Sequence, residues 1–212
     1  MPAPIEPKTG IDYLPASNGN YKYQVGWAEF FNEQKGEANG KRLITAPDVY
    51  RACKDAPNDL LASLRRDFKA SWLVTGTRII YNQNDLSGKV IHNYKSTIPN
   101  IKPVEIALSE INDFTRAPIQ EALEKGCLSF LQALFMTKDD GKLIMAALEK
   151  LSRATASRIQ VWTPSQIGRR DYPERAVGFF YLNNYFHVDG DWNDFHHGRA
   201  RGVQLVQEAK KR

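Results

Sequence analysis

The residues with the clearest chemical potential lie near the C-terminus, where three of the four histidines fall within eleven residues. The set is His187, His196 and His197, with Asp189, Asp191 and Asp194 among them. Imidazole nitrogens and carboxylate oxygens bind divalent metal ions, and a histidine–carboxylate pair exchanges protons near neutral pH. This cluster therefore predicts either a metal site or an acid–base pair.

The metal hypothesis takes its ligands from His187, Asp189, Asp191, Asp194 and His196. Residues 189–193 alternate oxygen-bearing side chains in the manner of the first ligands of a calcium loop. The match then ends, because Asp194 stands where that loop needs glycine and Ala200 where it needs glutamate. An EF-hand is excluded, and an irregular site for a divalent metal ion remains as a hypothesis. Zinc is disfavoured, because neither cysteine is near and the histidines lack HExxH spacing.

The acid–base hypothesis makes His187, Asp189 and Asp191 the catalytic residues of a hydrolase. A neighbouring carboxylate would fix the imidazole tautomer and raise the histidine pKa. No nucleophile motif such as Gly-x-Ser-x-Gly accompanies these residues. The alternative is that they are turn formers and surface residues of a solvated strand edge and loop, without a chemical role.

Strand alternation predicts how the first two of these residues are placed. If Asn183 and Asn184 form a two-residue turn, the strands on either side make a hairpin, because asparagine tolerates positive φ. Side chains alternate between the faces of a strand, so His187 and Asp189 share one face, about 7 Å apart at Cα. The opposite face is expected to belong to the core and carries Val177, Phe179, Tyr181, Phe186 and Val188.

A second set of residues combines arginines with aromatic side chains. It consists of Arg169, Arg170, Arg175, Arg199 and Arg201, with Trp162, Tyr172 and Trp192 interleaved. Arginine offers a planar fork that matches phosphate, and aromatic faces stack on bases. These residues predict a surface that binds a nucleic acid or a phosphorylated small molecule. The alternative is that the arginines form ordinary surface ion pairs, each worth less than about 1 kcal/mol.

The charge distribution agrees with an anionic partner. The formal net charge is +5, and residues 151–212 hold ten Lys and Arg against six Asp and Glu, an excess of four. A mild basic excess favours anionic partners without specifying one. The sequence contains no Walker loop, GxGxxG, RNP motif or helix-turn-helix signature, so any phosphate site is built in an unfamiliar way.

Composition restricts the class of protein. Hydrophobic residues make up 42% of the 212 residues and charged residues 25%, which excludes a mainly disordered chain. Two distant cysteines, and an N-terminus with no apolar run, favour the cytoplasm over secretion. No stretch approaches the roughly 18 apolar residues of a membrane span, so no membrane partner is expected.

Hydrophobic periodicity predicts an α+β fold. Extended patterns occupy residues 21–25, 71–81, 90–94, 158–162, 175–182, 185–189 and 199–206. Helical patterns begin at Thr45 and after Pro57, and two longer helices are expected over residues 118–134 and 140–151. We therefore expect a mainly antiparallel sheet of about six strands, with the pair of long helices packed on one face. Residues 1–20 should form an irregular arm, and residues 21–212 a single domain.

The function most favoured by the sequence is binding of a nucleic acid or phosphorylated ligand by the arginine and aromatic residues. A metal-dependent or acid–base hydrolase centred on the histidine and aspartate cluster is the first alternative. A structural or interaction protein without a catalytic site is the second. The sequence does not identify a ligand, a substrate or an oligomeric state.

Overall fold

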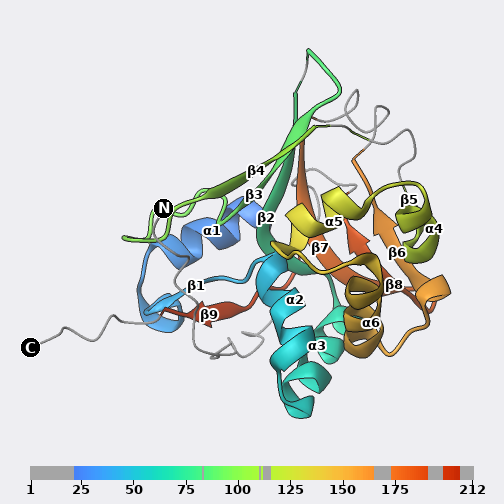
Figure 1. The fold of residues 1–212 in the computed structure, drawn as a ribbon. Coiled ribbons are helices and arrows are strands. Elements are labelled where there is room, and N and C mark those ends of the chain that lie inside the picture. Colours follow the sequence, from blue (N-terminus) through green and yellow to red (C-terminus); the bar gives the residue numbers. More distant parts are fainter. Residues whose placement is uncertain are drawn as a thin grey trace, which may run out of the picture.

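The computed structural model describes residues 22–82, 84–109, 111, 116–164, 173–190 and 198–205. Within these residues, a curled seven-stranded sheet has the strand order β4-β3-β2-β7-β8-β6-β5, and β1 pairs with β9 in a separate small sheet (Figure 1). Neighbours in the large sheet are antiparallel except β6 and β8, which are parallel. The expected mixed, mainly antiparallel architecture is confirmed, with seven strands in place of about six.

The strands have the following bounds. The large sheet contains β2 (Leu73–Tyr81), β3 (Gly88–His92), β4 (Val104–Leu108), β5 (Arg116–Pro118), β6 (Ile159–Trp162), β7 (Glu174–Leu182) and β8 (Tyr185–Asp189). The small sheet contains β1 (Lys41–Leu43) and β9 (Gly202–Gln204). The expected last strand at residues 199–206 is thus shorter and lies outside the large sheet, because β9 pairs with β1. Strand β4 is not among the strands expected from the sequence, because Pro99 and Pro103 favour a loop in this region.

The helices of the described residues are α1 (Gln24–Asn32), α2 (Ala46–Asp55), α3 (Asn58–Ala70), α4 (Ile119–Glu124), α5 (Leu128–Phe135) and α6 (Gly141–Ser152). Two short 3₁₀ helices, η1 (Gly36–Ala38) and η2 (Ala156–Arg158), complete the set. The expected strand at residues 21–25 is wrong, because α1 begins at Gln24. Its buried residues Gln24, Trp27, Ala28 and Phe31 follow helical spacing, which outweighs a short alternation.

The β7–β8 hairpin forms as the sequence predicts. Asn183 and Asn184 have φ of 50° and 65° and connect the strands as a two-residue turn. Phe179 pairs with Val188, and Phe180 pairs with His187, which is the expected register. Phe68 of α3 lies 6.1 Å from Phe179 and 5.3 Å from Phe186 between ring centroids, so this face of the hairpin belongs to the core. His187 therefore lies on the opposite face, as alternation requires.

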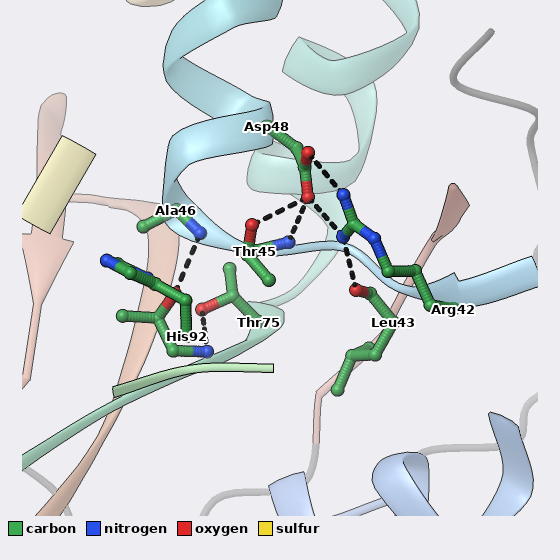
Figure 2. A network of polar contacts seen from close by, with 8 residues as sticks. Arg42, Leu43, Thr45, Ala46, Asp48, Thr75 and His92 are labelled. Carbon is green, nitrogen blue, oxygen red and sulfur yellow. Dashed lines mark hydrogen bonds and ion pairs between the residues drawn. The ribbon is translucent and has the colours of Figure 1, made fainter. Parts of the chain in front are cut away.

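The beginning of α2 is anchored by a buried ion pair. Asp48 accepts hydrogen bonds from the backbone N–H and the hydroxyl of Thr45, at 2.8 and 2.6 Å, and binds Arg42 through two bonds of 2.6 and 2.8 Å (Figure 2). Burial alone would raise the pKa of Asp48, but Arg42 and Thr45 outweigh it and hold that pKa below its usual value. Thr45 and Asp48 thus form a capping box where the sequence predicts the beginning of a helix.

The expected pair of long helices is only partly present. The first is broken into α4 and α5, because Gly126 has φ of +87°, a conformation that ends a helix. Close packing is not the reason for this glycine, since a Cβ built there meets no atom within 4 Å. Among the described elements, α2 contacts both α5 and α6, so the two predicted helices pack largely through a third.

Substitution of Gly126 by alanine is expected to lower the free energy of unfolding by about 1 kcal/mol, because an L-residue is strained at positive φ. The matched control is Gly26→Ala in α1, where a Cβ finds its nearest neighbour at 3.5 Å. That change is expected to raise stability by about 0.5–1 kcal/mol through helix propensity. Urea unfolding of both variants checks the prediction, and equal stabilisation by both would contradict it.

Candidate functional site

The candidate site lies where the two parallel strands end. Gln160 pairs with His187 and Val161 with Val188, so β6 and β8 run in the same direction and finish side by side. The antiparallel neighbours β5 and β7 begin at the same end of the sheet, with Arg116 opposite Trp162. Figure 1 shows β5, β6 and β8 together on one side of the molecule. We call this end, with Arg116, Trp162, Arg175 and Asp189, the β6/β8 edge.

A buried carboxylate forms part of this edge. Asp189 is 1% exposed, and its Oδ2 atom lies 2.7 Å from Nη2 of Arg116, whose side chain is 36% exposed. A buried carboxylate is stable only with a cation or several donors, and Arg116 supplies the charge. Sequence reasoning missed Arg116, because it lies 73 positions from Asp189 and reaches it only through the pairing of β5 with β6.

His187 is buried in a stack of rings and does not have the expected acid–base character. Its ring lies parallel to Phe180 at 4.6 Å, and Phe180 stacks on Trp72 at 3.8 Å. Burial, and then the charge of Arg116, lower the His187 pKa to about 4. The expectation that a carboxylate raises this pKa is therefore wrong in direction, because burial dominates and Arg116, which binds Asp189, adds to it.

The other predicted metal and catalytic residues, Asp191, Asp194 and His196, lie outside the described residues. Within the described residues, no group of three or more His, Cys, Asp or Glu side chains could hold a metal ion. The metal and hydrolase hypotheses therefore stay predictions. One divalent ion per chain in protein purified without chelator would support the first of them.

Two members of the arginine and aromatic set meet at the β6/β8 edge. The Cζ atom of Arg175 lies 5.2 Å from the centroid of the Trp162 ring, and each residue is 2% exposed. Tyr81 packs edge-on against Trp162, with a distance of 6.3 Å between the two ring centroids. Arg175 is thus a buried guanidinium held on an aromatic plane.

The other arginines of the set are placed elsewhere or fall outside the described residues. Arg169, Arg170, Tyr172 and Trp192 lie outside them. Arg199 bonds to the backbone of Trp72 and Val74, at the start of β2. Arg201 is 4% exposed and binds the carboxylate of Asp67. Since Arg175 pairs with Ile79, six residues along β2 from Leu73, roughly 20 Å of strand separates the two groups. The predicted surface of arginine and aromatic residues is therefore not continuous in the described part.

The described residues define an α+β protein with a mostly antiparallel sheet, whose parallel pair of strands ends at a buried, charged edge. Comparisons with protein-family models, with curated proteins and with solved structures give no match. Among the described helices, none combines the length and apolar character needed to cross a membrane.

Proposed function

We propose that the protein binds a phosphorylated ligand, a nucleic acid or a phosphorylated small molecule, at the β6/β8 edge. The observation that carries the proposal is the buried guanidinium of Arg175 on the Trp162 ring, with the partly exposed Arg116 in the position that pairs with Trp162 on the neighbouring strand β5. In open α/β sheets, ligands bind beyond the carboxyl ends of the parallel strands, and the single parallel pair of this sheet offers the same kind of end. Both β6 and β8 end here.

The chemistry of these groups fits phosphate. Arginine keeps its charge when buried and presents donors in a planar fork, which matches two phosphate oxygens. Trp162 holds the fork of Arg175 in one plane, and Asp189 fixes the orientation of Arg116. The three charged side chains of the edge carry one net positive charge, from Arg116, Arg175 and Asp189. An anionic ligand would therefore be favoured there by charge as well as by geometry.

The experiment compares two buried arginines, Arg175 at the β6/β8 edge and Arg201, which binds Asp67 and Ser63 of α3. Arg175→Lys keeps the positive charge but removes the planar fork at the β6/β8 edge. Arg201→Lys makes the same change at a residue that is 4% exposed and binds Asp67. We expect Arg175→Lys to weaken binding of ATP and of a 20-nucleotide single strand, measured by calorimetry, by roughly tenfold or more. The Arg201→Lys variant should bind within about twofold of the unmodified protein.

The two probes separate the sources of the phosphate. Binding of ATP with an affinity close to that of the oligonucleotide indicates a small phosphorylated ligand, and much tighter binding of the oligonucleotide indicates a nucleic acid. The thermal midpoint of each variant shows that both are folded at the assay temperature. Equal loss of binding in the two variants, or no binding of either probe by the unmodified protein, would contradict the proposal.

A further inference from the structure

A second group of cations lies at the opposite end of the sheet from the β6/β8 edge. It comprises Arg65 and Lys69 on α3, Lys150 on α6, and Arg153, which ends α6. Lys69 Nζ lies 5.9 Å above the ring of Tyr181, near the tip of the β7–β8 hairpin. We call these four residues the α3/α6 cation cluster.

Hydrogen bonds from Arg65 join the two helices of the cluster. Arg65 donates to the backbone carbonyls of Leu151 and Lys150, both at 2.7 Å, so its guanidinium lies at the C-terminal end of α6. The pKa of Arg65 is lowered from its usual value, by burial and then by repulsion from Arg153. The positive charges of Arg65 and Arg153 are therefore close enough to repel each other.

In the part of the chain that the structure describes, the cluster has no ion pair with a carboxylate. None of its four members forms an ion pair with an acidic side chain of the described residues. The acidic side chains of α3 and α6 either bind other groups or lie at the far end of the helix from the cluster. Asp67 binds Arg201, Glu149 accepts the backbone N–H of Ala156 at 2.8 Å, and Asp59 lies in the first turn of α3. The four cations of the cluster are thus not paired with any carboxylate of the described residues.

We infer that the α3/α6 cation cluster docks the sugar–phosphate backbone of a nucleic acid, independently of the β6/β8 edge. Lys69, Lys150 and Arg153 are exposed and Arg65 is partly exposed, so the cations form an open array. Arg65 and Lys69 are one helical turn apart, about 6 Å along α3, and the helix α6 beside it supplies the other two. A linear polyanion can contact such an array at several phosphates at once and release their counterions.

A lipid surface fits this array less well. Binding in the headgroup region needs exposed apolar side chains beside the cations. Among the described residues, α3 carries no exposed large apolar side chain, and Leu143 of α6 lies in its first turn. Leu182 and Tyr185 are exposed at the tip of the neighbouring hairpin, so anionic vesicles belong in the test.

The test uses the triple variant Lys69→Gln, Lys150→Gln and Arg153→Gln, which leaves Arg65 in place because it caps α6. The matched control is Lys102→Gln, Lys138→Gln and Lys142→Gln, three exposed lysines whose loss changes the net charge equally. Binding of a 20-base-pair duplex of random sequence is measured by fluorescence anisotropy from 50 to 200 mM salt. Phosphatidylserine vesicles are the second probe, in a co-sedimentation assay.

The triple variant is expected to bind the duplex roughly tenfold or more weakly at 50 mM salt. The slope of log affinity against log salt should become shallower by about 2 to 3, as expected for three lost phosphate contacts. The control should change affinity by less than about twofold. Equal losses in the two variants would show an effect of net charge alone and overturn the inference. Binding of vesicles but not of duplex would overturn it as well. Neither variant alters the β6/β8 edge, so this result is separate from the test of Arg175.

Discussion

Val188→Asp is expected to unfold the protein at room temperature. Val188 is 2% exposed, pairs with Phe179 across the hairpin and with Val161 on β6, and belongs to the core face. An aspartate there would bury a charge without a partner, which costs at least about 4 kcal/mol. This is a large part of the roughly 5–15 kcal/mol that stabilises a domain. Loss of the near-ultraviolet circular dichroism signal would show it.

The matched control is Leu182→Asp on the same hairpin. Leu182 is 52% exposed, so an aspartate stays in water and should change stability by less than about 0.5 kcal/mol. Phe186→Asp provides a second buried position on the same core face, because Phe186 is fully buried beside Phe68, and it should unfold the protein as Val188→Asp does. A folded Val188→Asp protein with a thermal midpoint near that of the unmodified chain would show that the hairpin register is different from the one described.

This hairpin shows where sequence reasoning succeeds. Its register depends on two adjacent residues, Asn183 and Asn184, and its faces follow from strict alternation. Both are local features that a sequence displays directly. The same is true of the capping box at Thr45 and Asp48, where spacing alone identifies the beginning of α2. Interior positions for β2 and β3 also follow, since both faces of these strands carry apolar residues.

Other features depend on contacts that spacing does not show. Arg116 binds Asp189 only because β5 pairs with β6, and β6 in turn lies parallel to β8. The burial that lowers the pKa of His187 depends in part on Trp72, which stacks on Phe180. Trp72 comes directly before β2, and β7 lies between β2 and the strand of His187, β8. An isolated sequence cluster of histidine and aspartate indicates chemistry, but the partners that set its charge come from distant segments.

The arginines illustrate the same limit on a larger scale. Arg175 and Arg199 lie within 25 positions in the sequence. Their pairing partners, Ile79 and Leu73, nevertheless lie six residues apart along β2. Conversely, Arg65 and Arg153 are far apart in the sequence and lie together at the end of α6. The positive charge of the C-terminal segment therefore predicts an anionic partner, but it does not predict which cations lie close together in the fold.

Acidification from pH 7 to pH 4 is expected to destabilise the protein by about 6 kcal/mol through two buried histidines. The pKa of His92 and that of His187 are each lowered from 6.5 to about 4, first of all by burial. The unfolded chain takes up a proton at each histidine below pH 6.5, whereas the folded chain does so only near pH 4. Stability is thus full above pH 6.5 and falls between pH 6.5 and 4, by about 3 kcal/mol for each group.

The surroundings of His92 explain why its protonation opposes folding. The ring Nε2 atom lies 3.1 Å from the carbonyl of Ala133 and therefore donates, so the neutral ring accepts at Nδ1 from the hydroxyl of Thr77 at 3.0 Å. That hydroxyl accepts the backbone N–H of Ala46 in turn, at 2.9 Å. A proton on Nδ1 would remove the acceptor for the Thr77 hydroxyl.

Burial sets the sign of the effect at both histidines, and the charged groups around them modify its size. Asp48 raises the His92 pKa, but burial, Arg42 and Arg51 lower it, and burial dominates. For His187, Arg116 adds to burial. Asp48 itself has a lowered pKa and titrates below its ordinary 3.8, so its contribution is lost at lower pH than that of the histidines. The window from pH 6.5 to 4 therefore reports mainly the two rings.

The double variant His92→Gln, His187→Gln isolates this effect from other losses of stability. Glutamine is neutral at every pH, so the variant should be less stable than the unmodified protein at pH 7 but lose much less stability on going to pH 4. Urea unfolding at half-unit pH steps gives both curves, and the difference between their slopes counts the protons taken up by the two rings on unfolding. Parallel curves for the two proteins would show that other groups cause the acid sensitivity. The single variants then assign the effect: His92→Gln should remove about half of the slope, because its ring and that of His187 have similarly lowered pKa values and lie on separate strands, β3 and β8.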